Sequence, residues 1–224
     1  MNNKGFTLIE LLISVTLLSL IMFAGNYVYS QLSSRWNKEL GDFEHNLSVL
    51  KGLNYLNQSL QGIEPYVVKT SKNIPVFFFI GADKSLLGVT KRGVFTDSRP
   101  EIFRISAVKN IDGKFSLVYQ ATSSASIILS KSDQEIEFHN QMVLLDDLDD
   151  VTFSYYGWPS LEVKTNPNQE EKEKWFPEYS GINNLLVPEK VSLTLVKNNQ
   201  NLLIQAQLDL ESNRWLQHHI KIGF

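Results

Sequence analysis

Glu10 is the residue of this sequence that most needs a chemical explanation. It lies inside the apolar stretch FTLIELLISVTLLSLIMF, and the next charged residue is Arg35. A carboxylate without a counter-charge in the apolar interior of a bilayer costs about 3 kcal/mol. We therefore expect Glu10 either to meet a cation or to lie at the membrane interface, where its side chain can reach water.

Four aspartates lie close together in the segment LLDDLDDV, and carboxylate oxygens are the ligands that calcium prefers. They are Asp146, Asp147, Asp149 and Asp150. Their spacing does not match an EF-hand loop, and no glycine stands where such a loop turns sharply. We expect a solvated turn between two strands, with a calcium site as the weaker alternative.

The sequence offers no constellation for catalysis. It contains no cysteine and no Gly-x-Ser-x-Gly, and Gly81, Gly88 and Gly93 are too widely spaced to cradle a phosphate. The adjacent His218 and His219 would point to opposite faces of a strand, so they could not share a metal ion. The formal net charge of −3 provides no basic surface for nucleic acid. We expect a protein that is not an enzyme, with no cofactor and no metal centre.

Two tryptophans, Trp158 and Trp175, accompany a polar stretch over residues 160–184 that contains the run Glu170-Glu171-Lys172-Glu173-Lys174. We expect residues 160–184 to form a long surface loop that can include a short helical turn. Burial in the core is the commoner role of tryptophan, but either residue could instead contact a partner.

Glu10 must be positioned by an apolar helix. Residues 6–28 are apolar or small apart from Glu10 and Asn26, and about 20 such residues span the hydrocarbon core of a bilayer. The stretch is too long for the apolar core of a secretory signal peptide. A conventional transmembrane anchor remains a rival, but the acid argues against it.

The helical period continues beyond the apolar segment. Apolar residues recur every three or four positions as far as Ile63, and the first proline is Pro65. The pattern predicts one helix from near Phe6 to about Gly62, whose second half presents an apolar stripe to a globular domain. Two helices with a break near Gly25-Asn26 are the alternative.

From Ile74 onward the apolar period changes to two, which predicts antiparallel strands with one covered face. Asp112-Gly113 and Asn198-Asn199-Gln200-Asn201 predict hairpin turns. The predicted fold is therefore α+β, with the long helix packed on the sheet. The expected strands are 75–81, 101–108, 114–120, 126–130, 135–145, 150–157, 190–196, 201–210 and 215–223.

The start of the chain resembles the signal of type IV pilins and type II secretion pseudopilins. That signal is a short polar leader ending in glycine, then an aromatic residue, Thr or Ser, two apolar residues and Glu; here it reads MNNKG-FTLIE. The resemblance implies that a prepilin peptidase cleaves between Gly5 and Phe6 and methylates the new amine of Phe6. It also implies that Glu10 pairs with the amine of a neighbouring subunit and so sets the stagger between packed helices.

A later segment is similar to the J-type minor pseudopilins and the W-type minor pilins. The similarity rests on VTFSYYGW at residues 151–158, KWFP at 174–177 and LVPEKVSL at 186–193. The family pattern departs from this chain in two places: Phe176 separates Trp175 from Pro177, and Val187 separates Leu186 from Pro188. Secretion, pilus and competence systems all remain open.

These resemblances imply a structural subunit rather than an enzyme. We expect a leader at residues 1–5, an assembly helix in the bacterial inner membrane at 6–28, an amphipathic half at 29–64 and a periplasmic domain at 65–224. The expected partners are other minor subunits and the major subunit, in a complex that initiates a pilus or pseudopilus and stays at its tip. A tip adhesin or substrate-recognition module on the same scaffold is the alternative function.

Overall fold

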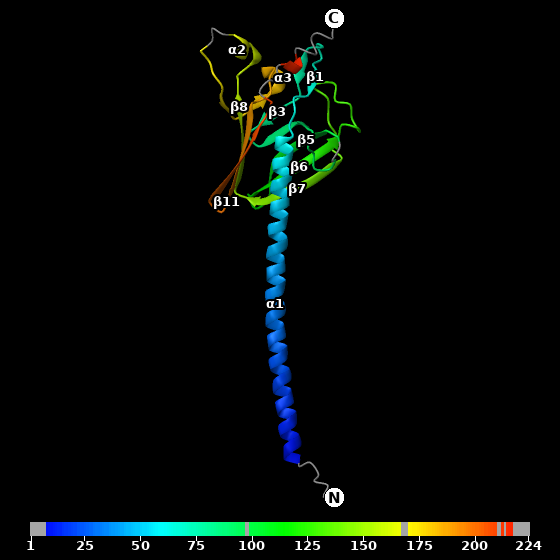
Figure 1. Ribbon diagram of the computed structural model, residues 1–224, viewed down its shortest axis with the longest axis vertical. Helices are drawn as coiled ribbons and strands as arrows, with labels where there is room; N and C mark the ends of the chain where they lie inside the picture. The colour runs from blue at the N-terminus through cyan, green and yellow to red at the C-terminus, as the bar shows by residue number, and fades with distance from the viewer. Residues whose placement is uncertain (1–7, 97–98, 167–169, 210–211, 213, 217–224) are drawn as a thin grey trace. The chain divides into compact units, whose positions relative to one another are not determined.

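The computed structural model describes residues 8–96, 99–166, 170–209, 212 and 214–216, and for residues 34–45 it describes the backbone alone (Figure 1). One long helix, α1 (Leu8–Gln61), precedes a β-rich part that includes the short helices α2 (Leu161–Thr165) and α3 (Gly181–Asn184). The chain forms two compact units, residues 1–48 and residues 49–224, and α1 contributes to both. The predicted α+β class, with one long N-terminal helix and antiparallel sheets, is confirmed.

The strands form three antiparallel sheets. The smallest consists of β1 (Val67–Lys69) and β2 (Pro75–Phe77). A six-stranded sheet has the order β10-β3-β4-β5-β6-β7 and is built from β3 (Ile80–Ala82), β4 (Ser85–Thr90), β5 (Glu101–Lys109), β6 (Phe115–Ser123), β7 (Asn140–Leu148) and β10 (Tyr179–Ser180). A four-stranded sheet has the order β12-β11-β8-β9 and is built from β8 (Asp150–Gly157), β9 (Lys174–Phe176), β11 (Lys190–Lys197) and β12 (Gln200–Gln207).

Helix α1 has nearly the predicted bounds. It runs without interruption through Gly25 and Asn26, so the alternative of two helices is wrong. It ends at Gln61, and the backbone N–H of Lys91 then donates to the carbonyl of Gly62 at 3.0 Å. A Cβ at Gly62 would lie 2.4 Å from Thr90 Oγ1. Glycine is therefore required where the chain leaves the helix and passes β4.

The last turns of α1 form part of the hydrophobic core of residues 49–224. Leu56 and Leu60 are fully buried there. The buried face is rotated from the stripe that the sequence predicts, because Gly52 faces the sheet while Leu50 remains 62% exposed. A Cβ on Gly52 would lie 1.9 Å from the carbonyl oxygen of Leu144 on β7. The helix thus approaches β7 more closely than any residue with a side chain would allow.

The predicted hairpins are confirmed. In the turn between β11 and β12, Lys197 pairs with Gln200 across Asn198 and Asn199, which have φ values of 52° and 60°. Two successive positive φ angles are typical of a type I′ turn, which asparagine tolerates. Gly113, with φ of 82°, lies in the turn between β5 and β6. In β11, the alternate apolar residues Val191, Leu193 and Leu195 are buried, in agreement with the predicted period of two.

Three of the strand predictions differ from the structure. The expected strand 75–81 is divided into β2 and β3, because Phe78 and Phe79 are both buried, in two different hydrophobic clusters. Residues 126–130 form no strand, and β7 begins at Asn140 rather than at residue 135. Strands β1 and β4 were not predicted. Of the expected strand 215–223, Trp215 and Leu216 are helical and the remainder, with His218 and His219, lies outside the described residues.

Residues 160–184 are not the single long loop that their polarity suggests. They contain α2 (Leu161–Thr165), β9, β10 and α3 (Gly181–Asn184). Strand β9 pairs with β8, and β10 pairs with β3, so this segment joins the edges of two different sheets. Tyr179 is buried, and its hydroxyl donates to the carbonyl of Trp158 at 2.7 Å. The polar segment 160–184 therefore contains a buried tyrosine, Tyr179, that fixes it to the rest of the protein.

A buried carboxylate connects β5 to the segment after β4. Glu101 accepts hydrogen bonds from the backbone N–H groups of Val94 (3.1 Å) and Phe95 (2.9 Å), the Thr96 hydroxyl (2.9 Å) and the Tyr119 hydroxyl (2.9 Å). Four donors offset the cost of removing this group from water. Burial, with the neighbouring Glu101 as a second cause, raises the pKa of Tyr119 far above its usual value.

Alkaline pH should therefore destabilise this part of the fold. The raised pKa of Tyr119 contributes stability that is complete below about pH 10, the pKa of an unfolded tyrosine, and is lost as pH rises further. Tyr119→Phe should make the pH dependence of the unfolding free energy shallower by about 1.4 kcal/mol per pH unit above pH 10.5. Urea unfolding of the full chain in detergent at a series of pH values checks this. Parallel curves for the two proteins would contradict it.

Candidate functional site

The first part of α1 is an apolar surface. Residues Leu8–Ser33, 26 residues in all, are long and apolar enough to cross a membrane, and in the part of the chain that the structure describes their side chains are exposed. Three hydroxyls within this stretch donate to carbonyls of the same helix: Ser14 to Glu10 (2.7 Å), Thr16 to Ile13 (2.9 Å) and Ser19 to Val15 (2.8 Å). Because these polar groups are satisfied internally, they add little cost in a bilayer.

Glu10 lies in the first turn of α1 with its side chain exposed. A negative charge near a helix N-terminus interacts favourably with the helix dipole. The predicted processing residues Gly5 and Phe6 lie outside the described residues, so the pairing of Glu10 with a cleaved amine stays a prediction. What the structure adds is that Glu10 lies on an exposed part of α1.

Residues 1–25 match the family model for the prokaryotic N-terminal methylation motif. The chain carries this type IV pilin-like signal. The matched residues include Gly5, Phe6 and Glu10, and the methylation motif implies a substrate of prepilin peptidase and a membrane-associated, structural role. No curated protein matches the sequence. The motif ends at residue 25, so it leaves open the type of subunit to which the β-rich unit belongs.

The two tryptophans named as contact candidates have different environments. Trp158 follows β8 and is partly buried, and its carbonyl accepts the Tyr179 hydroxyl. Trp175 on β9 is 47% exposed, and its ring lies 5.3 Å from that of Tyr156. The ammonium group of Lys190 lies over the ring of the same Tyr156, at 5.3 Å from the ring centre. Trp175 is therefore the better candidate for contact with a partner.

The aspartates near the β7–β8 turn face lysines. Asp147 pairs with Lys197 (3.4 Å). Asp149 pairs with Lys114 and also accepts the backbone N–H of Asn198 at 2.7 Å. In the part of the chain that the structure describes, no three acidic or histidine side chains are grouped so as to hold a metal ion. Asp149 lies in the turn between the two strands, whereas Asp146 and Asp147 belong to β7 and Asp150 begins β8.

Asp150 pairs with Lys84 at 2.8 Å, and this contact joins β8 to the turn between β3 and β4. The hydrogen bond from Lys84 lowers the pKa of Asp150, and Lys114 likewise lowers that of Asp149. Partial burial acts to lower the pKa of Lys84, but its contacts with Asp150 and Asp83 outweigh this and raise it. The lysines thus supply the counter-charge that a calcium ion would otherwise provide.

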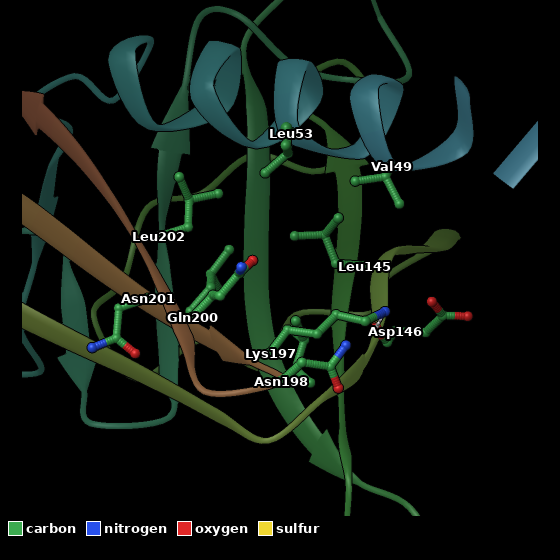
Figure 2. Close-up of a pocket in the computed structure, with 11 residues that line it drawn as sticks. Val49, Leu53, Leu145, Asp146, Lys197, Asn198, Gln200, Asn201 and Leu202 are labelled. Atoms are coloured by element: carbon green, nitrogen blue, oxygen red, sulfur yellow. Dashed lines mark hydrogen bonds between the residues drawn. The ribbon is translucent and has the colours of Figure 1, made fainter. Parts of the chain in front are cut away.

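A cleft that the sequence does not reveal lies within residues 49–224. It has a volume of about 430 Å³ and is bounded by α1, the end of β7 and the β11–β12 hairpin. Figure 2 shows Val49 and Leu53 projecting from α1 toward the side where Leu145 and Leu202 lie, with Lys197 and Asp146 at the rim. The period of two predicted for residues 201–210 places Leu202 on the same face as Ile204, Ala206 and Leu208, yet Leu202 is 45% exposed because it lines this cleft.

Proposed function

We propose that this chain is a minor subunit of a pilin-type filament, anchored in the bacterial inner membrane before it assembles. The observation that carries the proposal is an apolar, uncovered helix with Glu10 as the only formally charged residue within Leu8–Ser33, inside a methylation motif. Because the helix is uncovered along its whole apolar length, neighbouring helices can replace lipid around it. The β-rich unit then lies on the periplasmic side.

Assembly would use two kinds of interaction along the helix. Apolar side chains give attraction with little preference for one stagger over another. The pairing of Glu10 with the amine of a neighbouring subunit's first residue, after cleavage between Gly5 and Phe6, gives that preference, because either charge alone is costly in a dry environment. The similarity of residues 151–193 to J-type and W-type subunits supports a place in the complex at the filament tip.

A tip adhesin or substrate-recognition module is the second candidate. The observation in its favour is the exposed ring of Trp175, which lies beside Tyr156 on the four-stranded sheet, while Lys190 lies over the same tyrosine ring. Residues 160–184 cannot be deleted to test it, because the deletion would remove β9 and β10 from two sheets. A single substitution at Trp175 avoids that damage.

Cross-linking in native membranes tests the two candidates together. A tagged full chain should recover other chains that carry the methylation motif, and Trp175→Ala should recover them equally well. The adhesin function is correct if the wild-type chain captures a secreted or surface ligand and Trp175→Ala loses that capture while recovering the motif-bearing chains equally well. If the wild-type chain recovers no other motif-bearing chain, the subunit function is wrong.

A further inference from the structure

Strand β12 is an edge strand among the described residues, and its own sequence lacks the usual protective residues. Among the residues that the structure describes, it pairs only with β11 and ends the four-stranded sheet. Edge strands usually carry a charged residue, a proline or a bulge that discourages pairing with another chain. Residues 198–208, NNQNLLIQAQL, contain neither a charge nor a proline, and the pairing of β12 with β11 shows no bulge. An eight-residue edge of this kind is a template for another strand.

The turn determines which main-chain groups of β12 face outward. In a two-residue hairpin the closing pair, here Lys197 and Gln200, is hydrogen-bonded, and the bonded pairs then alternate along the ladder. Two observed bonds fix the same phase: Leu208 N–H donates to the Glu189 carbonyl (2.8 Å), and the Val196 carbonyl turns away from β12 to accept from Asp149 (2.7 Å). The outward main-chain groups of β12 are therefore those of Asn201, Leu203, Gln205 and Gln207.

The inner face of the same strand opens onto the cleft. Leu202 lines the cleft with Val49, Leu53 and Leu145, and it is half exposed because no strand lies beyond β12 among the described residues (Figure 2). Further along, Ala206 and Leu208 are buried. A strand added at this edge would place every second side chain on the inner face, beside Leu202 and over the cleft. The outward main-chain groups and the apolar cleft therefore both favour an extended ligand with an apolar side chain at every second residue.

We propose that the outer edge of β12 binds an extended segment of a partner subunit, apolar at every second residue, by strand addition. Main-chain hydrogen bonds to Leu203 and Gln205 would hold the segment, and its inward apolar side chains would cover the cleft beside Leu202. The identity of the partner as a fellow subunit rests on the proposed function; the strand-binding edge itself does not.

A different subunit fits this edge better than a second copy of the chain. Two copies joined by antiparallel pairing of their β12 strands would be related by a two-fold axis, which closes on itself. A filament needs contacts that join different surfaces and continue from subunit to subunit. An extended segment on one subunit and an open edge on the next make such a contact.

A synthetic peptide with the β11 sequence KVSLTLVK is the probe, because β11 already pairs with the other edge of β12 and is apolar at alternate residues. Fluorescence anisotropy of the labelled peptide with the full chain in detergent should show saturable binding. Gln205→Pro removes one outward N–H and no bond to β11, and it should weaken binding at least tenfold. The matched control Gln205→Thr keeps the N–H and should bind like the wild type.

A second measurement protects the conclusion if Gln205→Pro unfolds. The same peptide, N-methylated at alternate amides along one edge, should lose binding to the wild-type chain when the methylated edge is the one that faces β12. No saturable binding, or equal binding of both methylated forms and the parent, would overturn the proposal. If the full chain forms dimers and Gln205→Pro abolishes them, the proposal is also overturned, because the strand that pairs with β12 would then belong to a second copy of the chain.

The peptide experiment separates this inference from the proposed function. It needs no filament, so binding to β12 can be established even if cross-linking recovers no motif-bearing chain. Conversely, recovery of such chains together with absent peptide binding would retain the subunit function and reject the edge.

Discussion

Glu10→Ala is expected to leave cleavage between Gly5 and Phe6 intact and to lower incorporation into the filament about a hundredfold. Removing one partner of a charge pair in a dry environment leaves the other charge uncompensated, at a cost of about 3 kcal/mol. Here the stranded charge would be the amine of the neighbouring subunit. The measurement is quantitative blotting of sheared filaments against the membrane fraction, with mass spectrometry of the mature N-terminus.

Two further substitutions separate charge from packing. Glu10→Gln keeps the size and polarity of the side chain, so it should fail nearly as badly as Glu10→Ala. Ser14→Ala lies one helical turn later and removes only a hydroxyl that donates to the Glu10 carbonyl, so it should assemble normally. Normal incorporation of both Glu10 variants would show that charge pairing is not needed for assembly.

Gly52→Ala should destabilise residues 49–224 by about 3 kcal/mol, although alanine is the better helix former. The added Cβ would lie 1.9 Å from the Leu144 carbonyl oxygen and 2.8 Å from its carbonyl carbon. These are backbone atoms of β7 and cannot rotate away, so α1 must move off the sheet and lose packing around Leu56 and Leu60. The gain of up to about 1 kcal/mol in helix propensity does not offset this.

The same helix supplies a matched control for that substitution. A Cβ at Gly25 meets nothing within 4 Å. Gly25→Ala should therefore leave the unfolding transition of the β-rich unit unchanged. Urea unfolding followed by tryptophan fluorescence compares the two variants, and equal midpoints for Gly52→Ala and wild type would mean that the close approach of α1 to β7 is not maintained in solution.

The environment of Glu10 and the register of the hairpins can be predicted from the sequence, because both depend on residues that are close together in the chain. An apolar run with one acid predicts a helix that must find lipid or other helices, whatever the rest of the chain does. The positive φ angles at Asn198 and Asn199 follow from the residue types that tolerate them. For the same reason the end of α1 lies within a residue of the predicted Gly62.

Polarity misled the interpretation of residues 160–184. Their charges predict a surface loop, yet Tyr179 pairs with Gly81 on β3 and Trp175 pairs with Tyr156 on β8. Gly81 lies far from Tyr179 in the sequence, and the charged residues around Trp175 do not show the alternating apolar pattern of the strand that contains Tyr156. Short edge strands need few apolar residues, because only one of their sides and part of one face are covered.

What the sequence determined by itself is therefore the set of local conformations: the helix, its acid, its stop, and the two hairpin turns. Only the tertiary structure decided which glycine of α1 touches a sheet, that Phe78 and Phe79 are both buried, and that uncharged β12 lies at an edge. The physical reason is that strand order and close packing depend on contacts between residues far apart in the chain. Local period and residue type do not record those contacts.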